Sequence, residues 1–234
     1  MMISVVTPAF NEAQTLPLRA AELAQDAGSH EWIVVDGGSE DDTLAVARRC
    51  GARVVPAPRS RGLQQNAGAA VARGEALLFL HADTALPQGA LAAIRAVLLD
   101  PRVDCGNFTF RFADDGRTGA FLSWWYVLQQ RAFGVCFGDS ALWVRRAAFE
   151  AVAGFPDEPI MEDYALVRKL LARGGRASFR RLPLVVRSSA RRYRGRPLRT
   201  IALWALMLGL YHVGVAPKHL ARLYPSRRAS DSVT

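Results

Sequence analysis

The sequence predicts an α/β fold with a mixed, mostly parallel sheet and helices on both of its faces. Short apolar or β-branched runs alternate with longer segments of helical periodicity through the first hundred residues. Strand and helix follow one another four times, and strands joined through helices pair in parallel. Half of the 234 residues are apolar, which is enough to bury the core of one large domain.

Each element follows from local periodicity and turn residues. In the first hundred residues the expected strands are 3–7, 32–35, 53–55 and 77–80, and the expected helices are 13–27, 41–49, 61–73 and 88–99. Beyond them, strands are expected at 103–112 and 140–144, with two short ones within 176–187 broken by Pro183; helices are expected at 117–133, 146–152 and 162–173. Trp124, Trp125 and Tyr126 are interpreted as core residues, with an acceptor platform as the alternative.

The C-terminal part of the chain differs in composition from the rest. Residues 1–163 hold 14 basic and 20 acidic residues, whereas residues 164–234 hold 16 basic and one acidic residue. Such a basic segment could bind substrate phosphates, anionic lipid or nucleic acid. It could equally be a solvent-exposed face without a partner. Residues 198–215 are apolar, but the uninterrupted stretch is about 11 residues long, short of the roughly 20 that span a bilayer.

We therefore expect one large domain at 1–197, an apolar and basic helical extension at 198–226 and a tail at 227–234. The extension is predicted to cap the domain or to lie at a membrane surface. The three cysteines form no CxxC pair, and the N-terminus shows no basic leader, so the expected location is the cytoplasm. Peripheral contact at the inner face of the plasma membrane stays open.

Polar residues follow three of the expected strands, at the edge where ligands bind in parallel sheets. The run LLFLHADTALP places Asp83 just past a buried strand. One carboxylate there, with substrate phosphates, suits Mg²⁺ or Mn²⁺, although it could instead cap the following helix. Pro8 and Glu12 follow the first strand, and Asp36 follows the second.

Two later segments also carry acids. In PIMEDYALVRKLL, Glu162 and Asp163 open an amphipathic helix. Acids at a helix start ordinarily complement the helix dipole, but one held there is also placed to accept a hydroxyl proton. In CFGDSALWVRR, Asp139 precedes a strand and is a candidate substrate-binding residue. The alternative is that it belongs to a simple turn.

The order of the segments TPAFNE, VVDGGSEDDT, RSRGLQQNAGAAVARGEALLFLHADT, GDSALWVRR, AGFPDEP and MEDYAL resembles the family 2 glycosyltransferases with the GT-A fold, over residues 2–175. Within them the chain is most similar to a short subfamily of radical-SAM/selenodomain-associated transferases. The resemblance implies a nucleotide pocket at Pro8 and Glu12, a base contact at Asp36 and a base or diphosphate contact at Arg61. It implies a metal at Asp83, the last acid of the DxD motif, and a catalytic base at Asp163 beside Glu162.

The sequence departs from the family pattern at several places. His81 occupies the position at which relatives carry the first acid of DxD; it could replace that acid as a hydrogen-bond donor or merely fill the space. Asp36-Gly37-Gly38-Ser39 occupies the position at which many relatives carry DDGS. SSARRYRGRP resembles the QxxRW motif of processive synthases only loosely, through a cluster that suits a diphosphate and a sugar face: Arg191, Arg192 and Tyr193.

Taken together, the resemblance implies a metal-dependent, inverting hexosyltransferase that uses a nucleotide sugar, a UDP-sugar first of all. The acceptor would be a hydroxyl group, with a lipid-linked or cell-envelope glycan as an open choice. The alternatives are a nucleotidyltransferase, an NAD-dependent oxidoreductase and a basic nucleic-acid-binding module. The first two lack their glycine-rich loops after the first strand, and no nucleic-acid partner is expected.

Overall fold

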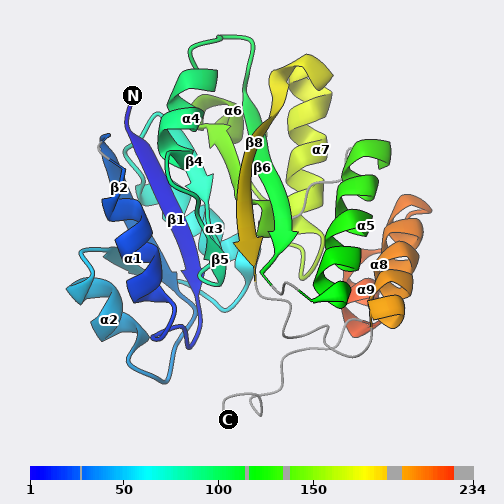
Figure 1. The fold of residues 1–234 in the computed structure, drawn as a ribbon, viewed down its shortest axis with the longest axis horizontal. Helices are drawn as coiled ribbons and strands as arrows, with labels where there is room; N and C mark the ends of the chain where they lie inside the picture. Colours follow the sequence, from blue (N-terminus) through cyan, green and yellow to red (C-terminus); the bar gives the residue numbers. More distant parts are fainter. Residues whose placement is uncertain (27, 114–115, 134–137, 189–196, 224–234) are drawn as a thin grey trace.

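The computed structural model describes residues 1–26, 28–113, 116–133, 138–188 and 197–223. Within them, one eight-stranded sheet lies between helices on both faces (Figure 1). The strands are β1 (Ile3–Ala9), β2 (His30–Asp36), β3 (Arg53–Pro56), β4 (Ala76–Phe79), β5 (Thr84–Ala85), β6 (Cys105–Phe112), β7 (Leu142–Arg145) and β8 (Phe179–Ser188).

The helices alternate with these strands through the first half of the chain, as predicted. They are α1 (Leu16–Ala24), α2 (Thr43–Arg49), α3 (Arg61–Val71), α4 (Ala90–Val97), α5 (Arg117–Phe133), α6 (Arg146–Ala151), α7 (Glu162–Gly174), α8 (Pro197–His212) and α9 (Pro217–Leu223), with short 3₁₀ helices η1 (Gly138–Ser140) and η2 (Arg176–Ser178).

The sheet has the order β3-β2-β1-β4-β7-β6-β8-β5. The first four strands are parallel, and β7 pairs antiparallel with both β4 and β6. Strands β6 and β8 are parallel, and β5 is antiparallel to β8. The predicted α/β class with a mixed, mostly parallel sheet is therefore confirmed, and the ends of β1, β2 and β4 meet at one edge.

Side chains along the central strands alternate between two cores. In β2, Trp32 and Val34 face the core beneath α1, α2, α4 and α5. Ile33 and Val35 face the core beneath α3, α6 and α7. Because both faces are covered, central strands such as β2 and β4 carry continuous apolar runs (Trp32–Val35 and Ala76–Phe79) rather than an alternating pattern.

Helix α3 packs unusually close to the sheet because its inward residues are small. A Cβ at Gly68 would collide with Cγ1 of Val6 and would lie 2.9 Å from Cγ2 of Val35. The closeness places the first turn of α3 directly beside the ends of β1 and β2.

The C-terminal helices pack on the domain by one face. The ring of Trp204 in α8 stacks on that of Phe112, with the centroids 6.3 Å apart. Other inward side chains of α8 and α9 join residues that flank the start of α7 in a third apolar cluster: Ile160, Met161, Tyr164, Met207, Leu208 and Leu220. The predicted boundary near residue 197 stays a prediction, since 189–196 lie outside the described residues. Within the described residues, no helix has both the length and the apolarity to cross a membrane.

Three expectations need correction. Helix α1 begins at Leu16 rather than residue 13, because Pro17 fits the first helical turn and the preceding residues form a turn around Glu12. Residues 179–188 form one strand and not two, since β8 passes Pro183 through a bulge opposite the Phe108–Thr109 step. Trp124 is exposed on α5 instead of lying in the core, whereas Tyr126 is buried.

Candidate active site

The loops that follow β1 and β2 are tied to each other at the carboxyl edge of the sheet. The amide of Asn11 donates to Ser39 Oγ at 2.9 Å, and the amide of Glu40 donates to Asn11 Oδ1 at 2.9 Å. Asn11 has φ 55°, a left-handed conformation that asparagine tolerates better than most residues. The amide of Glu12 donates to Thr43 Oγ1 at 2.8 Å. Both loops are therefore built as one unit.

Asp36 is buried at the end of β2 and organises the turn that follows it. Its carboxylate accepts hydrogen bonds from the amides of Gly38 and Ser39 and from Ser39 Oγ, the last at 2.5 Å. These donors fix the orientation of the Asp36 side chain. A nucleobase N–H would share this carboxylate with the turn, so the predicted base contact stays a prediction.

Pro8 and Glu12 both lie half-buried near Asp36 along this edge. Pro8 is the penultimate residue of β1 and pairs with Val35. Glu12 Oε2 accepts a hydrogen bond from the hydroxyl of Thr15, with the two oxygens 2.9 Å apart. Their predicted place beside a nucleotide is compatible with this position, and nothing in the geometry assigns them a contact.

Gln64 in α3 is a site-building residue that the sequence patterns did not reveal. Its Nε2 donates to the carbonyl of Ala9 at 3.0 Å and to that of Val35 at 2.8 Å. It thus clamps β1 and β2 together one residue from Asp36. The signal in the sequence was a polar pair, Gln64-Gln65, on a helix rich in glycine and alanine.

The same helix reaches the segment that carries the predicted base. Asn66 Nδ2 donates to the carbonyl of Phe155 at 2.9 Å, and the amide of Phe155 donates back to Asn66 Oδ1 at 3.0 Å. Arg61 Nε lies 2.7 Å from Glu162 Oε1. Helix α3 therefore links the β1–β2 edge to the start of α7, although Asp36 and Glu162 are 126 positions apart in sequence.

Glu162 and Asp163 are buried, with 1% and 5% of their surfaces exposed. This excludes the interpretation of solvated acids that merely complement the dipole of α7. Burial raises the pKa of the Glu162 carboxyl to about 7; the charge of Arg61 opposes the rise, and that of Asp163 adds to it. Met161, immediately before them, has φ 68° and holds the helix start in a strained left-handed turn.

His81 faces this acidic pair from the other side of the site. Its Nδ1 lies 3.2 Å from Oδ1 of Asp139, a half-exposed residue of η1. Burial lowers the pKa of His81, but the hydrogen bond and charge of Asp139, with the charge of Asp163, outweigh it and raise the pKa overall. The structure thus brings Arg61, His81, Asp139, Glu162 and Asp163 into one cluster.

Asp83 is half-buried in the turn between β4 and β5, two residues after His81. Next to it, the hydroxyl of Thr84 and Nε2 of His81 are buried without a hydrogen-bond partner among the described residues. The same part of the chain contains no group of three or more carboxylate, imidazole or thiol side chains that could hold a metal. A single carboxylate can hold Mg²⁺ or Mn²⁺ when substrate phosphates and water supply the other ligands, and the metal site expected at Asp83 stays a prediction.

The remaining predicted contacts, Arg191, Arg192 and Tyr193, lie outside the described residues. Gln65, one turn along α3 from Arg61, is buried, and neither of its amide atoms has a hydrogen-bond partner within the described residues. Orphaned buried polar atoms at Gln65, Thr84 and His81 are costly unless a ligand satisfies them.

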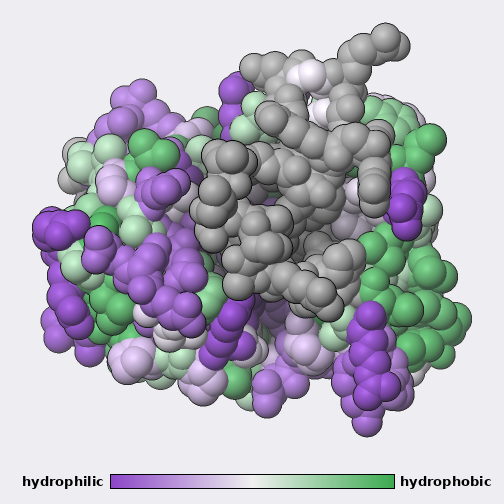
Figure 2. Space-filling model, turned by 90° about the horizontal axis from the view of Figure 1, so that it is seen from below, coloured by the Kyte–Doolittle hydropathy of each residue, from purple (hydrophilic) through white to green (hydrophobic). Residues whose placement is uncertain are grey.

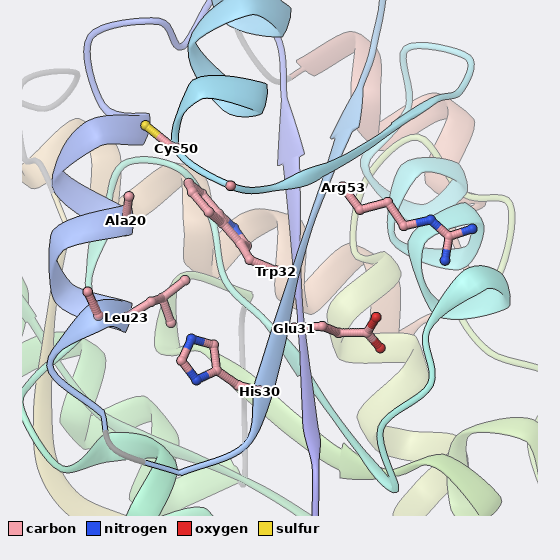
Figure 3. Close-up of a pocket in the computed structure, with 9 residues that line it drawn as sticks. Ala20, Leu23, His30, Glu31, Trp32, Cys50 and Arg53 are labelled. Atoms are coloured by element: carbon pink, nitrogen blue, oxygen red, sulfur yellow. The ribbon is translucent and has the colours of Figure 1, made fainter.

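A surface hollow of about 400 Å³ lies elsewhere, between α1, β2 and the turn after α2 (Figure 3). Leu23, His30 and Trp32 point into it, whereas the side chains of Glu31 and Arg53 point to the opposite side of β2. None of the predicted site residues lines it.

Comparison with known proteins supplies the family. The family model for glycosyl transferase family 2 matches residues 4–143. An uncharacterised glycosyltransferase of Mycobacterium bovis is 37% identical over 97 residues, which cover 41% of this chain and 43% of the relative. A PGL/p-HBAD biosynthesis glycosyltransferase of Mycobacterium tuberculosis is 37% identical over 93 residues, 36% of each chain. These matches span less than half the length of the curated relatives.

Solved structures agree on the fold. Glucosyl-3-phosphoglycerate synthase from Mycobacterium tuberculosis, in complex with Mn²⁺, UDP and glucosyl-3-phosphoglycerate, gives a TM-score of 0.65 at 20% identity, covering 92% of this chain and 80% of that one. Mannosyl-3-phosphoglycerate synthase from Rubrobacter xylanophilus gives 0.64 at 21%, covering 98% and 78%. The sheet and its flanking helices thus have the GT-A architecture, and the chain belongs to glycosyl transferase family 2.

Proposed function

We propose that this protein is a metal-dependent, inverting glycosyltransferase that moves a sugar from a UDP-sugar to a hydroxyl acceptor. The observation that carries the proposal is the buried Glu162–Asp163 pair at the start of α7, held against Arg61 and His81. Two buried carboxylates are costly to maintain, and groups kept in such an environment are typical of proton-transfer sites.

In the proposed reaction Asp163 is the general base. The acceptor oxygen forms a bond to the anomeric carbon of the donor, while the bond from that carbon to the diphosphate oxygen breaks. The hydroxyl proton passes to the Asp163 carboxylate, and the electron pair of the broken bond leaves with the diphosphate. Attack from the face opposite the leaving group inverts the anomeric configuration.

The leaving diphosphate requires positive charge. Arg61, the first residue of α3, is half-exposed, and its guanidinium contacts the Glu162 carboxylate. Asp83 would hold a divalent metal, Mg²⁺ or Mn²⁺, which when bound neutralises charge on the diphosphate. Asp139, through its contact with His81, keeps the histidine oriented beside the acids.

Two observations support a UDP-sugar donor. The carboxylate of Asp36 is fixed as an acceptor at the sheet edge, where it suits the N–H of a uracil. A protein of the same fold, glucosyl-3-phosphoglycerate synthase, is known in complex with Mn²⁺ and UDP-glucose. Pro8, Glu12, Arg191, Arg192 and Tyr193 remain proposed contacts to the donor, and the subfamily resemblance remains a proposal as well.

The acceptor class is proposed from the relatives and the charge of the chain. A curated relative is named for PGL/p-HBAD biosynthesis, which favours a lipid-linked or cell-envelope acceptor. The basic C-terminal part of the sequence suits an acceptor or surface that carries negative charge. A cytoplasmic location is kept as a prediction.

A donor screen tests the proposal. Purified protein is incubated with UDP-, GDP- and dTDP-sugars, with Mn²⁺ or with a chelator, and released nucleoside diphosphate is measured. We expect release from a UDP-sugar that stops in chelator, and an anomeric configuration in the product opposite to that of the donor. Release that is insensitive to chelator, or retention of configuration, would overturn the metal or the inverting assignment respectively.

A further inference from the structure

Helix α8 exposes an apolar stripe although its other face is packed. Counting from its start, the outward residues follow helical spacing of three and four and end just past the helix: Leu198, Ala202, Leu206, Gly209 and Val213. Leu206 is 52% exposed and Val213 78% exposed. The stripe is therefore not part of any core formed by the described residues.

The neighbouring helix α5 repeats the pattern. Phe121, Trp124 and Leu128 recur along one face of α5 and are exposed, and the rings of Phe121 and Trp124 stack with centroids 6.0 Å apart. Figure 2 shows apolar residues gathered on the side of the molecule that α5, α8 and α9 occupy in Figure 1. Folded monomers rarely leave so many large apolar side chains uncovered on adjacent helices.

Positive charge accompanies the stripe. Arg199 in α8 and two residues of α9, Lys218 and Arg222, are exposed. Between residues 164 and 223 the sequence contains no aspartate or glutamate. A protein face that combines apolar and basic side chains and lacks acids is complementary to an anionic lipid bilayer, which has charged headgroups over an apolar interior.

The packed side of α8 contacts α7, the helix that carries the proposed base. Oη of Tyr164, the residue after Asp163, lies 3.0 Å from Nε2 of His212 at the end of α8. Nδ1 of His212 lies 2.8 Å from the carbonyl of Leu208 and donates to it, so Nε2 accepts a hydrogen bond from the hydroxyl of Tyr164. One side of α8 therefore contacts the catalytic helix, and the other side carries the stripe.

We propose that the outward face of α8 and α9 docks on an anionic lipid bilayer, with the apolar stripe in the interfacial region and the basic residues at the headgroups. A second copy of this chain is the less favourable occupant, because a symmetric interface would bring the basic residues of both copies together without acids to pair them. The docking does not depend on the transfer reaction, but it would present a membrane-bound hydroxyl acceptor to the side of the protein that carries Asp163.

Vesicle flotation with the full chain tests the proposal. One set of vesicles contains phosphatidylcholine alone, and another contains an equimolar mixture of phosphatidylcholine and phosphatidylglycerol. We expect flotation with the mixed vesicles that weakens as salt is raised, and little with phosphatidylcholine alone. The double variant Leu206→Gln/Val213→Gln is expected to reduce partition by at least about tenfold.

A matched control and a charge variant sharpen the result. Leu18 is 59% exposed and Leu99 is 84% exposed, both outside α5, α8 and α9, so Leu18→Gln/Leu99→Gln is expected to leave partition unchanged. Lys218→Gln and Arg222→Gln are expected to reduce it by about fivefold each. The midpoint of thermal unfolding, measured for every variant, reports the fold and does not depend on whether the proposed transfer is correct.

Other outcomes would overturn the inference. Equal loss of flotation in the control double variant, or binding that ignores lipid charge, would show non-specific adsorption. A protein that does not float but sediments as a dimer, and becomes monomeric with Leu206→Gln/Val213→Gln, would assign the face to self-association instead.

Discussion

The first residues of two helices are joined by an ion pair: Arg61 Nε at the start of α3 lies 2.7 Å from Glu162 Oε1 at the start of α7. The arginine is half-exposed, whereas the glutamate is buried. The pair thus connects a buried acid beside the proposed base to a cation that solvent, and an incoming diphosphate, can reach.

Replacement of Arg61 should affect both stability and donor binding. Arg61→Ala leaves the buried Glu162 without its nearest positive charge, so we expect a loss of about 1 kcal/mol at neutral pH, limited by the exposure of the guanidinium. Affinity for a UDP-sugar should also fall. Arg61→Lys should restore stability better than donor affinity, because lysine keeps the charge but not the two-pronged geometry. Urea denaturation and calorimetric titration measure the two effects; equal behaviour of both variants would contradict the assignment.

The raised pKa of Glu162 predicts a pH dependence of stability. Its pKa is about 7 in the folded protein, against 4.5 for an ordinary glutamate, so the folded state retains the proton to higher pH. The free energy of unfolding should therefore decrease as pH rises from about 4.5 through about 7. The side chain in Glu162→Gln cannot ionise, so over this pH range its free energy of unfolding should decrease by about 3 kcal/mol less than that of the natural chain. The pKa of His81 is also raised, so His81 too makes the free energy of unfolding decrease as pH rises. This residue is present both in the natural chain and in the Glu162→Gln variant.

Substitution of the proposed base should separate binding from turnover. Asp163→Asn keeps the size of the side chain but cannot accept the acceptor proton, so we expect turnover to fall about a thousandfold. Binding of UDP with Mn²⁺ should be nearly unchanged. Asp157→Asn, an exposed acid in the preceding loop, is the matched control and should remain active. Full activity of the Asp163 variant would exclude it as the base.

Asp83 is expected to affect nucleotide binding only when metal is present. Asp83→Ala should weaken UDP binding in Mn²⁺ by at least about tenfold, while weak binding in chelator stays the same. The exposed Asp157→Asn variant again serves as the control. If the Asp83 variant binds UDP and Mn²⁺ as tightly as the natural chain, the metal lies at another position.

The close contact of α3 with the sheet gives a test of packing. Gly68→Ala would press a methyl group onto Val6, and we expect a loss of about 2 kcal/mol in unfolding free energy. Gly209→Ala in α8 meets no atom within 4 Å and should be neutral or stabilising, because alanine favours the helix. Denaturant titration of both variants decides the matter, and equal effects would refute the packing argument.

Much of the site was visible in the sequence because its residues follow strands at predictable places. Asp36 and Asp83 follow buried apolar runs, and the edge at which parallel strands end is fixed by their direction. The position of Glu162 and Asp163 at a helix start was equally clear. Their roles were assigned by resemblance and remain to be tested.

Other parts of the site could not be predicted, because they depend on contacts between segments far apart in the chain. The clamp of Gln64 on the ends of β1 and β2 needs the register of two strands and the depth of α3. The pairing of His81 with Asp139 needs β7 to lie beside β4, an antiparallel insertion that local periodicity does not reveal. The bulge at Pro183 likewise depends on the partner strand.

The sequence by itself determined the α/β class, the order of the elements and the gathering of polar residues at one sheet edge, since these depend on local periodicity and strand direction. Only the tertiary structure decided that Glu162 and Asp163 are buried, that Arg61 is the partner of Glu162 and that one face of α8 is covered and the other bare. Burial and pairing depend on which distant surfaces meet, and the free energy that selects those meetings is summed over the whole core rather than over neighbouring residues.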